Sequence, residues 1–528
     1  MKKTLYLTLS LLFLFFLSQA QTKSFENVES YAPAALGPIK KGAEVKGYYL
    51  CYLTQQVKGK ISKLSYNEYT LQILDLDLNI TKTVTVKGPL GFYIKDSYAT
   101  ENEFSFTFFN EDLAVRQIAV DSTGSTIGEY KLSEPSMFDK YLPNDKYNNN
   151  VGIGSSVFTP IGNIGYGRID PRSTYGIWGF ETESNFYLEV TNKKLDQLWV
   201  YQNPKPDFKL NFGQIKYTSD QYIGLFESKK ASMSKRTYKH SFTLLDTKTG
   251  KVQFEYPLNE RVENLPDNVF IDETKGEITI VANYFPSGKN FYSAEPEGIY
   301  IITLNLKGSL LSEKKVLWSQ LNPLYKSSDN KPLDKKNYTY ITFHSMQKSK
   351  DGHFVLVGEQ LSKTKNRVAV SMQETSRDWV GFGIRTNNMV AIELNADCSP
   401  TSYSSFSKRE TESIEISYYH AGGEVEFISE QVWAMGHYDY RFTTKEPGTD
   451  NCSFVYIDRN KFTDDNETTG TMCGIIKYEN GVLTNTKESL NLTSNEFAIK
   501  EAKPGYMLIS EYLPVPKTIK LRIEKINK

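Results

Sequence analysis

The chain has 528 residues, of which 39% are hydrophobic and 13% aromatic, and this is enough apolar material for a large core. Lys and Arg together number 62, as do Asp and Glu, so the overall charge gives no reason to expect nucleic acid or an anionic membrane as a partner. Tyr (35) and Phe (30) far outnumber Trp (5), and such an aromatic load favours strands over helices.

The first twenty residues have the pattern of a signal peptide. Met1-Lys2-Lys3 is a short basic segment, residues 5–17 are almost wholly apolar, and Ser18-Gln19-Ala20 supplies small residues where a signal peptidase reads. The apolar run is shorter than the roughly 20 residues that a membrane helix needs, and no later stretch is long enough either. We therefore expect residues 1–20 to be removed and the mature protein to be exported, to a periplasm or out of the cell.

A short N-terminal segment, residues 21–46, separates this leader from the main β region, residues 47–528. That region repeats one unit: an alternating apolar strand, a turn containing Asp, Asn or Gly, and a second strand. Alternation with a period of two buries one face of a strand, and these turn residues tolerate the backbone of tight hairpins. The eight copies begin at Tyr69, Arg116, Asn185, Ser241, Tyr300, Met389, Gly474 and Lys520.

Most copies are preceded by further short strands, such as residues 102–108, 221–226 and 277–282, which makes about four strands per repeat. This rhythm resembles that of β-propeller proteins in general, across nearly the whole mature chain. The resemblance implies an all-β ring of about seven or eight four-stranded blades with loop insertions. The unpaired strand at Lys520 would then be completed by a strand from residues 21–46. Stacked β-sandwich domains are the alternative, because the turns are irregularly spaced, at roughly 45 to 90 residues.

The four cysteines suit an exported protein. Cys51 lies in an apolar run and is expected in the core, whereas Cys452 and Cys473 flank a polar loop. An oxidising compartment would permit a disulfide between those two. No Cys-x-x-Cys pair and no His/Cys cluster with zinc spacing occurs, so we predict no metal and no cofactor.

Three insertions interrupt the repeat, and inserted loops on a rigid scaffold often carry function. The first, residues 141–176, is rich in Asn and Gly but lacks the context of a phosphate-binding loop, so an ordered surface loop is predicted. The second, residues 372–388, combines aromatic and charged side chains that could clamp a sugar or a peptide, although its Trp could instead pack on a neighbouring blade. Its candidate binding residues are Arg377, Asp378, Trp379, Phe382 and Arg385.

The third insertion begins at Trp433. On a strand, His437, Asp439 and Arg441 would share one face at two-residue spacing. A histidine beside a carboxylate could serve as an acid–base pair or as metal ligands, and a solvated strand face is the simpler interpretation.

These features predict an exported binding or scaffold protein that recognises a protein, a peptide or a glycan through loops on one propeller face. The absence of a coherent catalytic set of residues favours binding over catalysis. The alternative is a secreted hydrolase or lyase acting on polysaccharide or peptide, with carboxylates and His437 gathered around the propeller axis. An envelope component whose surface is wholly structural is a third alternative.

Overall fold

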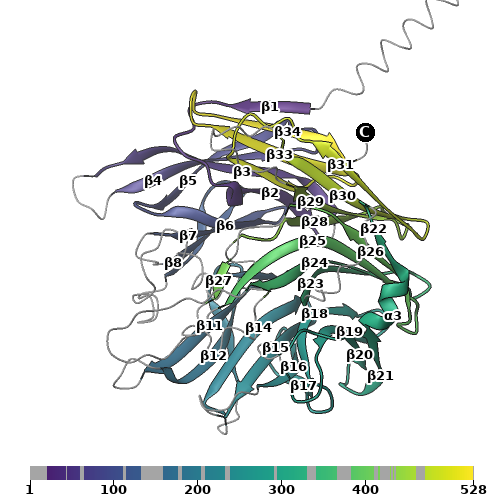
Figure 1. The fold of residues 1–528 in the computed structure, drawn as a ribbon. Coiled ribbons are helices and arrows are strands. Elements are labelled where there is room, and N and C mark those ends of the chain that lie inside the picture. The colour runs from purple at the N-terminus through teal and green to yellow at the C-terminus, as the bar shows by residue number, and fades with distance from the viewer. Residues whose placement is uncertain are drawn as a thin grey trace, which may run out of the picture.

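A computed structural model of the chain describes residues 21–42, 44–59, 65–110, 115–131, 158–175, 181–203, 208–231, 238–289, 294–329, 340–364, 382–409, 414–416, 429, 432, 436–458 and 470–526. These residues form eight four-stranded antiparallel blades arranged in a ring, a β-propeller (Figure 1). The fold predicted from the strand rhythm is confirmed, and the number of blades is eight.

In each blade the first strand lies innermost and the fourth lies at the rim. The strands of blades 1 to 4, in this order, are β2 (Leu36–Lys41), β3 (Glu44–Val57), β4 (Tyr66–Leu74) and β5 (Ile80–Pro89); β6 (Tyr93–Ala99), β7 (Glu103–Phe109), β8 (Val115–Asp121) and β9 (Thr126–Lys131); β10 (Thr159–Ile161), β11 (Gly165–Tyr175), β12 (Glu181–Asn192) and β13 (Gln197–Gln202); β14 (Leu210–Thr218), β15 (Tyr222–Lys230), β16 (Lys239–Asp246) and β17 (Val252–Pro257).

The strands of blades 5 to 8 follow the same order: β18 (Asn264–Asp272), β19 (Glu277–Tyr284), β20 (Gly298–Asn305) and β21 (Leu310–Leu317); β23 (Tyr340–Lys348), β24 (Phe354–Thr364), β25 (Phe382–Leu394) and β26 (Pro400–Phe406); β28 (Tyr440–Lys445), β29 (Cys452–Asp458), β30 (Met472–Glu479) and β31 (Val482–Ser489); β32 (Phe497–Glu501), β33 (Tyr506–Leu513), β34 (Thr518–Lys525) and β1 (Gln21–Phe25). Blade 6 carries two extra strands, β22 (Tyr325–Ser327) on β26 and β27 (Ile414–Ile416) on β25. Short helices η1 (Pro33–Ala35), α3 (Trp318–Leu321) and η4 (Asn322–Leu324) lie in connections.

The eight repeat copies seen in the sequence are the third strands of the eight blades, from β4 to β34. A third strand is hydrogen-bonded on both sides and packs between neighbouring blades, so its alternation is strong. The turn after it is held by the Asp or Asn side chain: Asp75 accepts the backbone N–H groups of Asp77 and Asn79, both at 2.8 Å. Asn305 repeats this arrangement in blade 5. These turn residues are therefore structural.

The ring is closed by pairing the two ends of the chain. β1 runs antiparallel to β34, from Gln21 opposite Ile523 to Phe25 opposite Ile519, and Figure 1 shows β1 beside the yellow C-terminal strands. Phe25 is 5% exposed and packs with residues of blades 8 and 1, including the ring of Tyr52. This contact gives the last blade its fourth strand and covers an edge that would otherwise be open.

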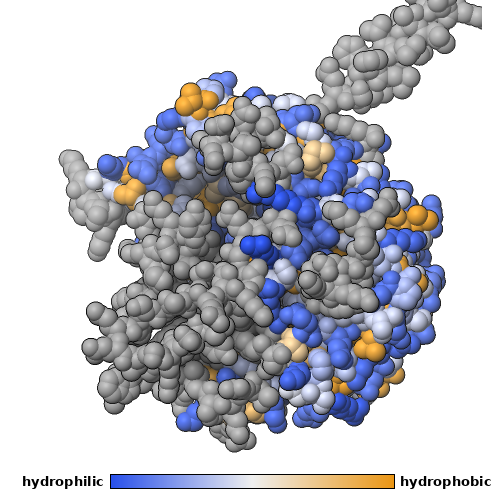
Figure 2. Space-filling model, viewed as in Figure 1, coloured by the Kyte–Doolittle hydropathy of each residue, from blue (hydrophilic) through white to orange (hydrophobic). Residues whose placement is uncertain are grey.

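The hydrophobic core is divided among the interfaces between successive blades. Each of the clusters of buried side chains draws on two neighbouring blades, as between blades 5 and 6 or between blades 8 and 1. Large apolar residues that stay exposed, such as Leu198, Val252, Leu311 and Val482, lie on fourth strands at the rim. Figure 2 shows that the described part of one face is mostly hydrophilic.

Two sequence-based predictions are corrected. Part of the expected Gly-rich loop, residues 141–176, forms β10 (Thr159–Ile161) and β11 (Gly165–Tyr175), while residues 141–157 and 176 lie outside the described residues. Glycine suits position 167 because a Cβ there would lie 2.7 Å from Ile161 Cδ1. Cys452 and Cys473 are both buried free thiols rather than a disulfide. They lie on adjacent strands but five positions out of register, which separates them by about 16 Å along the strands, too far for a disulfide. Cys51 is buried in the core, as predicted.

Within the described ranges, no helix is long and apolar enough to cross a bilayer.

Candidate functional site

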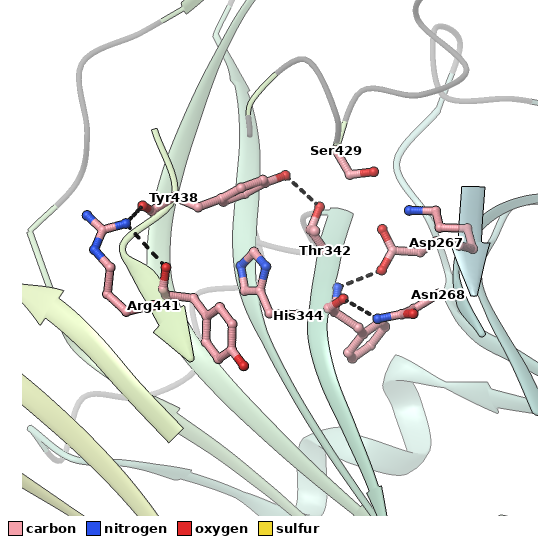
Figure 3. A pocket seen from close by; sticks show the side chains of 10 residues that line it. Asp267, Asn268, Thr342, His344, Ser429, Tyr438 and Arg441 are labelled. Atoms are coloured by element: carbon pink, nitrogen blue, oxygen red, sulfur yellow. Dashed lines mark hydrogen bonds between the residues drawn. The ribbon is translucent and has the colours of Figure 1, made fainter. Parts of the chain in front are cut away.

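A pocket of about 270 Å³ opens at the inner strands of four consecutive blades. Blades 4 to 7 contribute through β14, β18, β23 and β28, and a segment just before β28 adds two more side chains. The lining residues are Lys216, Asp267, Asn268, Thr342, Phe343, His344, Ser429, Tyr438, Tyr440 and Arg441 (Figure 3).

Four of these side chains owe their direction to β-bulges. The pairing register of each inner strand skips one residue: Lys216 in β14, Asp267 in β18, His344 in β23 and Arg441 in β28. A bulge leaves one residue unpaired and re-aims its side chain, and bulges are frequent beside functional sites. The ring thus presents one ionisable residue from the same place in four successive blades.

Asp267 ties blade 5 to blade 6. Its Oδ2 accepts the backbone N–H of Phe343 at 2.6 Å, and its Oδ1 accepts the hydroxyl of Tyr340 at 3.2 Å. Burial raises the pKa of Asp267 to about 6, against the opposing effects of Lys216 and of the Phe343 N–H. The neighbouring Asn268 side chain donates to the Phe343 carbonyl at 2.8 Å. Among the lining residues that the structure describes, Asp267 is the one carboxylate, and both of its oxygens are engaged by the protein.

His344 lies between two tyrosines. Its ring stacks on Tyr440 with the ring centres 4.9 Å apart, and it meets Tyr438 edge-on at 4.5 Å. Its Nε2 lies 3.3 Å from a carboxylate oxygen of Glu359, behind the pocket. The Tyr438 hydroxyl donates to Thr342 Oγ1 at 2.9 Å, and Figure 3 shows Tyr438 reaching across toward Thr342. The pocket lining therefore combines aromatic rings with hydroxyl groups.

Arg441 is held by backbone carbonyls, since its Nη1 donates to the oxygen atoms of Tyr438 and Tyr440 at 2.8 and 3.3 Å. On the other side of the pocket, the Lys216 ammonium lies 5.9 Å from the centre of the Phe226 ring. Two basic side chains, Lys216 and Arg441, thus flank the site, and among the described lining residues they outnumber the one carboxylate.

A buried ion-pair network lies behind the pocket. Lys408 contacts both Asp439, at 2.7 Å, and Glu359, at 3.1 Å. Glu359 Oε1 also accepts the backbone N–H groups of Asp439 and Tyr440, at 2.8 and 2.9 Å. These contacts fix the start of β28, and through it the position of Arg441.

Of the residues that the sequence singled out, Arg441 alone is a lining residue of this pocket. The expected strand face with His437, Asp439 and Arg441 is wrong, because β28 begins only at Tyr440 and the His437 N–H donates instead to the Val432 carbonyl. Asp439 points instead to Lys408. Arg385 is exposed on β25, whereas Arg377, Asp378, Trp379, Trp433 and the side chain of Phe382 lie outside the described residues.

Sequence reasoning missed Lys216, Asp267 and His344. A signal was present, because each follows an apolar or proline residue within the first strand of its blade. That signal emerges only when first strands are aligned with one another. Among the described residues, no group of three or more His, Cys, Asp or Glu side chains is placed to hold a metal ion.

The ring of eight blades around an axial pocket places the protein in the β-propeller class. The chain belongs to DUF6770, a family of unknown function, which matches residues 1–527. No curated protein matches the sequence.

Several solved propellers resemble the fold at very low sequence identity. They include the Dos1 propeller (9% identity, 95% of this chain and 94% of that one, TM-score 0.38) and a europium-containing methanol dehydrogenase (10%, 93% and 85%, TM-score 0.41). The β-propeller domain of the Trilobed protease from Pyrococcus furiosus is a third (13%, 71% and 95%, TM-score 0.29). At these TM-scores the likenesses carry no argument about this chain, and no function is transferred from them.

Proposed function

We propose that this protein is an exported binding protein that takes up one sugar unit of a glycan in the axial pocket. The observation that carries the proposal is the pocket itself. It is concave and formed by inner strands, and its size, about 270 Å³, lies just below the usual range for small-molecule sites, which suits a single sugar unit.

The chemistry of the lining supports a sugar. Thr342, Ser429 and Tyr438 bring hydroxyl groups, and Asn268 brings an amide. Such groups can both donate to and accept from the hydroxyls of a saccharide. The rings of Tyr438 and Tyr440, which line the pocket, supply apolar surface for the C–H faces of a sugar ring.

The same set of lining residues favours binding over hydrolysis. Glycoside hydrolysis commonly uses two carboxyl groups that flank the scissile bond. The described pocket has one, Asp267, and both of its oxygens are already occupied. The protein would therefore hold a glycan without cleaving it.

Calorimetric titration of the purified protein with neutral gluco- and manno-oligosaccharides and with oligogalacturonates tests this proposal. We expect at least one probe to bind, and Ser429→Phe, which fills the pocket, to abolish that binding. The matched control is Ser312→Phe, on the exposed fourth strand of blade 5. Equal affinity in Ser429→Phe, or chromatographic proof that the probe is cleaved, would overturn the proposal, provided both variants melt like the wild type.

Export is a separate part of the proposal, supported by the basic and apolar pattern of residues 1–20. N-terminal sequencing of protein recovered from its native envelope or medium should begin at Gln21. Recovery of the full chain from the cytosol would contradict export.

A further inference from the structure

We infer that the propeller axis is an anion-binding site, and that the ligand of the axial pocket is an acidic saccharide whose carboxylate lies among basic residues contributed by successive blades. This inference deepens the proposed function and rests on it.

The basis is a positional repeat in the inner strands. In seven of the eight blades, the first strand carries an ionisable residue directly after an apolar, aromatic or proline residue, and we call this set the axial ring. The axial ring consists of Lys40, Lys95, Lys216, Asp267, His344, Arg441 and Lys500. Blade 3, whose first strand β10 has only three residues, has no member.

Bulges show that the repeat is structural as well as sequential. Lys95 is the residue skipped in the pairing of β6 with β7, just as Lys216, Asp267, His344 and Arg441 are skipped in their strands. Four of these five bulged residues line the pocket. Five blades therefore use one backbone device to place a charge-bearing side chain at the same level of the ring.

The charge of the axial ring is strongly one-sided. It has five basic residues against one acid, and against three acids when the neighbouring Asp96 and Glu501 are included. Glu501 is already paired with Lys40 at 2.6 Å. Burial raises the pKa of Asp96 to about 6, opposed by its bond from the Ser97 N–H and by Lys500 and Lys95. The axis therefore stays positive in a molecule whose total formal charge is zero.

Lys500 is the member of the axial ring that a bound anion would stabilise most. Its ammonium makes no hydrogen bond and no ion pair with any residue that the structure describes, although the residue is partly buried. Burial lowers its pKa, and Arg441 on the adjacent blade lowers it further, while Asp96 opposes them. Two cations that repel each other in a partly dry site are stabilised by an anion placed between them.

Arg441 links the pocket of blades 4 to 7 with Lys500 in blade 8. It lines the pocket of blades 4 to 7, and its charge acts on Lys500 in blade 8. A sugar ring in the pocket could thus direct a carboxylate toward Arg441 and Lys500 without leaving the axis. A uronate residue combines the hydroxyls that the pocket suits with the anion that the axial ring suits.

The test compares oligogalacturonates with neutral oligosaccharides of equal length, each titrated into the protein at low and high salt. We expect tighter binding of the uronate, weakened by salt because screening acts on charge pairs. Lys500→Met should weaken uronate binding roughly tenfold and leave neutral binding unchanged, as expected for loss of one charged contact. Lys500→Arg should restore most of the affinity, and Lys520→Met, an exposed charge in the same blade, is the matched control.

The outcomes separate the two proposals. Equal affinity for uronate and neutral probes, or no effect of Lys500→Met, would overturn the anion site and leave saccharide binding in place. Binding of a polyglutamate peptide with no binding of either saccharide would overturn both. Thermal unfolding of each variant identifies loss of binding that is due merely to loss of the fold.

Discussion

The ammonium of Lys408 lies 3.1 Å from a carboxylate oxygen of Glu359, and neither side chain has exposed surface. The same ammonium contacts Asp439, just before the strand that carries Arg441. Burial alone would raise the pKa of Glu359, but the charges of Lys408 and His344 and the backbone bonds outweigh it and lower that pKa to about 2. Through the contact of Lys408 with Asp439 and the bonds that Glu359 accepts from the Asp439 and Tyr440 N–H groups, this pair joins blade 6 to blade 7 directly behind the candidate site.

Lys408→Met should destabilise the protein by about 3 to 5 kcal/mol, because it leaves two buried carboxylates without their counter-ion. Urea denaturation at pH 7 measures the change. Lys314→Met removes an exposed partner of Asp397, 3.6 Å away, and should cost about 1 kcal/mol or less. A similar, small loss in both variants would show that the buried pair is not important for stability.

The pH dependence of stability should report Asp267. Its folded-state pKa is raised to about 6 from 3.8, so the folded protein binds more protons than the unfolded chain between these values. Stability from this group is present below about pH 4 and is lost as pH rises through 6, by roughly 2 to 3 kcal/mol. In Asp267→Asn this decline should shrink when unfolding is followed from pH 4 to 8. An unchanged profile would mean that Asp267 does not carry the effect.

Ring closure should depend on Phe25. Phe25→Ala removes a side chain buried between the closing strand and blade 1, and we expect a loss of about 3 to 5 kcal/mol with a lowered melting temperature. Val515→Ala, at a position that is 90% exposed, is the control. If both variants melt together with the wild type, β1 contributes little to the stability of the ring.

The cysteines should be unreactive in the folded protein. All four are buried free thiols, and burial raises the pKa of Cys452 and of Cys473 to about 12. Since the thiolate is the reactive form, an aromatic disulfide reagent should detect no fast thiol in native protein and four in denaturant. Only two thiols in denaturant without reductant would indicate a disulfide instead.

The sequence predicts this fold well because the third strand of each blade has a recognisable pattern. From Tyr69 to Lys520, strict alternation followed by an Asp, Asn or Gly turn is a local pattern, and each copy marks one blade. First strands are shorter and less regular, since they meet both the core and the axis. For that reason the propeller architecture of about seven or eight four-stranded blades could be predicted from the sequence, whereas the inner surface could not.

The site was harder to predict because it depends on register. Asp267 and His344 are 77 positions apart and come together only because β18 and β23 lie side by side, each with one extra residue. A bulge has no dependable sequence signal, so a single sequence cannot show which side chain is turned toward the axis. The prediction favoured insertions with conspicuous aromatics, and of that set Arg441 reached the pocket.

The pairing of Gln21 with Ile523 also constrains the order of assembly. These residues lie 502 positions apart in the sequence, so the contact can form only after both strands have been synthesised, and joining them costs the entropy of closing a very long loop. A chain that stops before Thr518 would leave β1 without its partner and β33 with an open edge. Unpaired edges invite association with other chains. Only a chain that contains both β1 and β34 covers this edge of blade 8, so a truncated chain would be more prone to associate with other chains here.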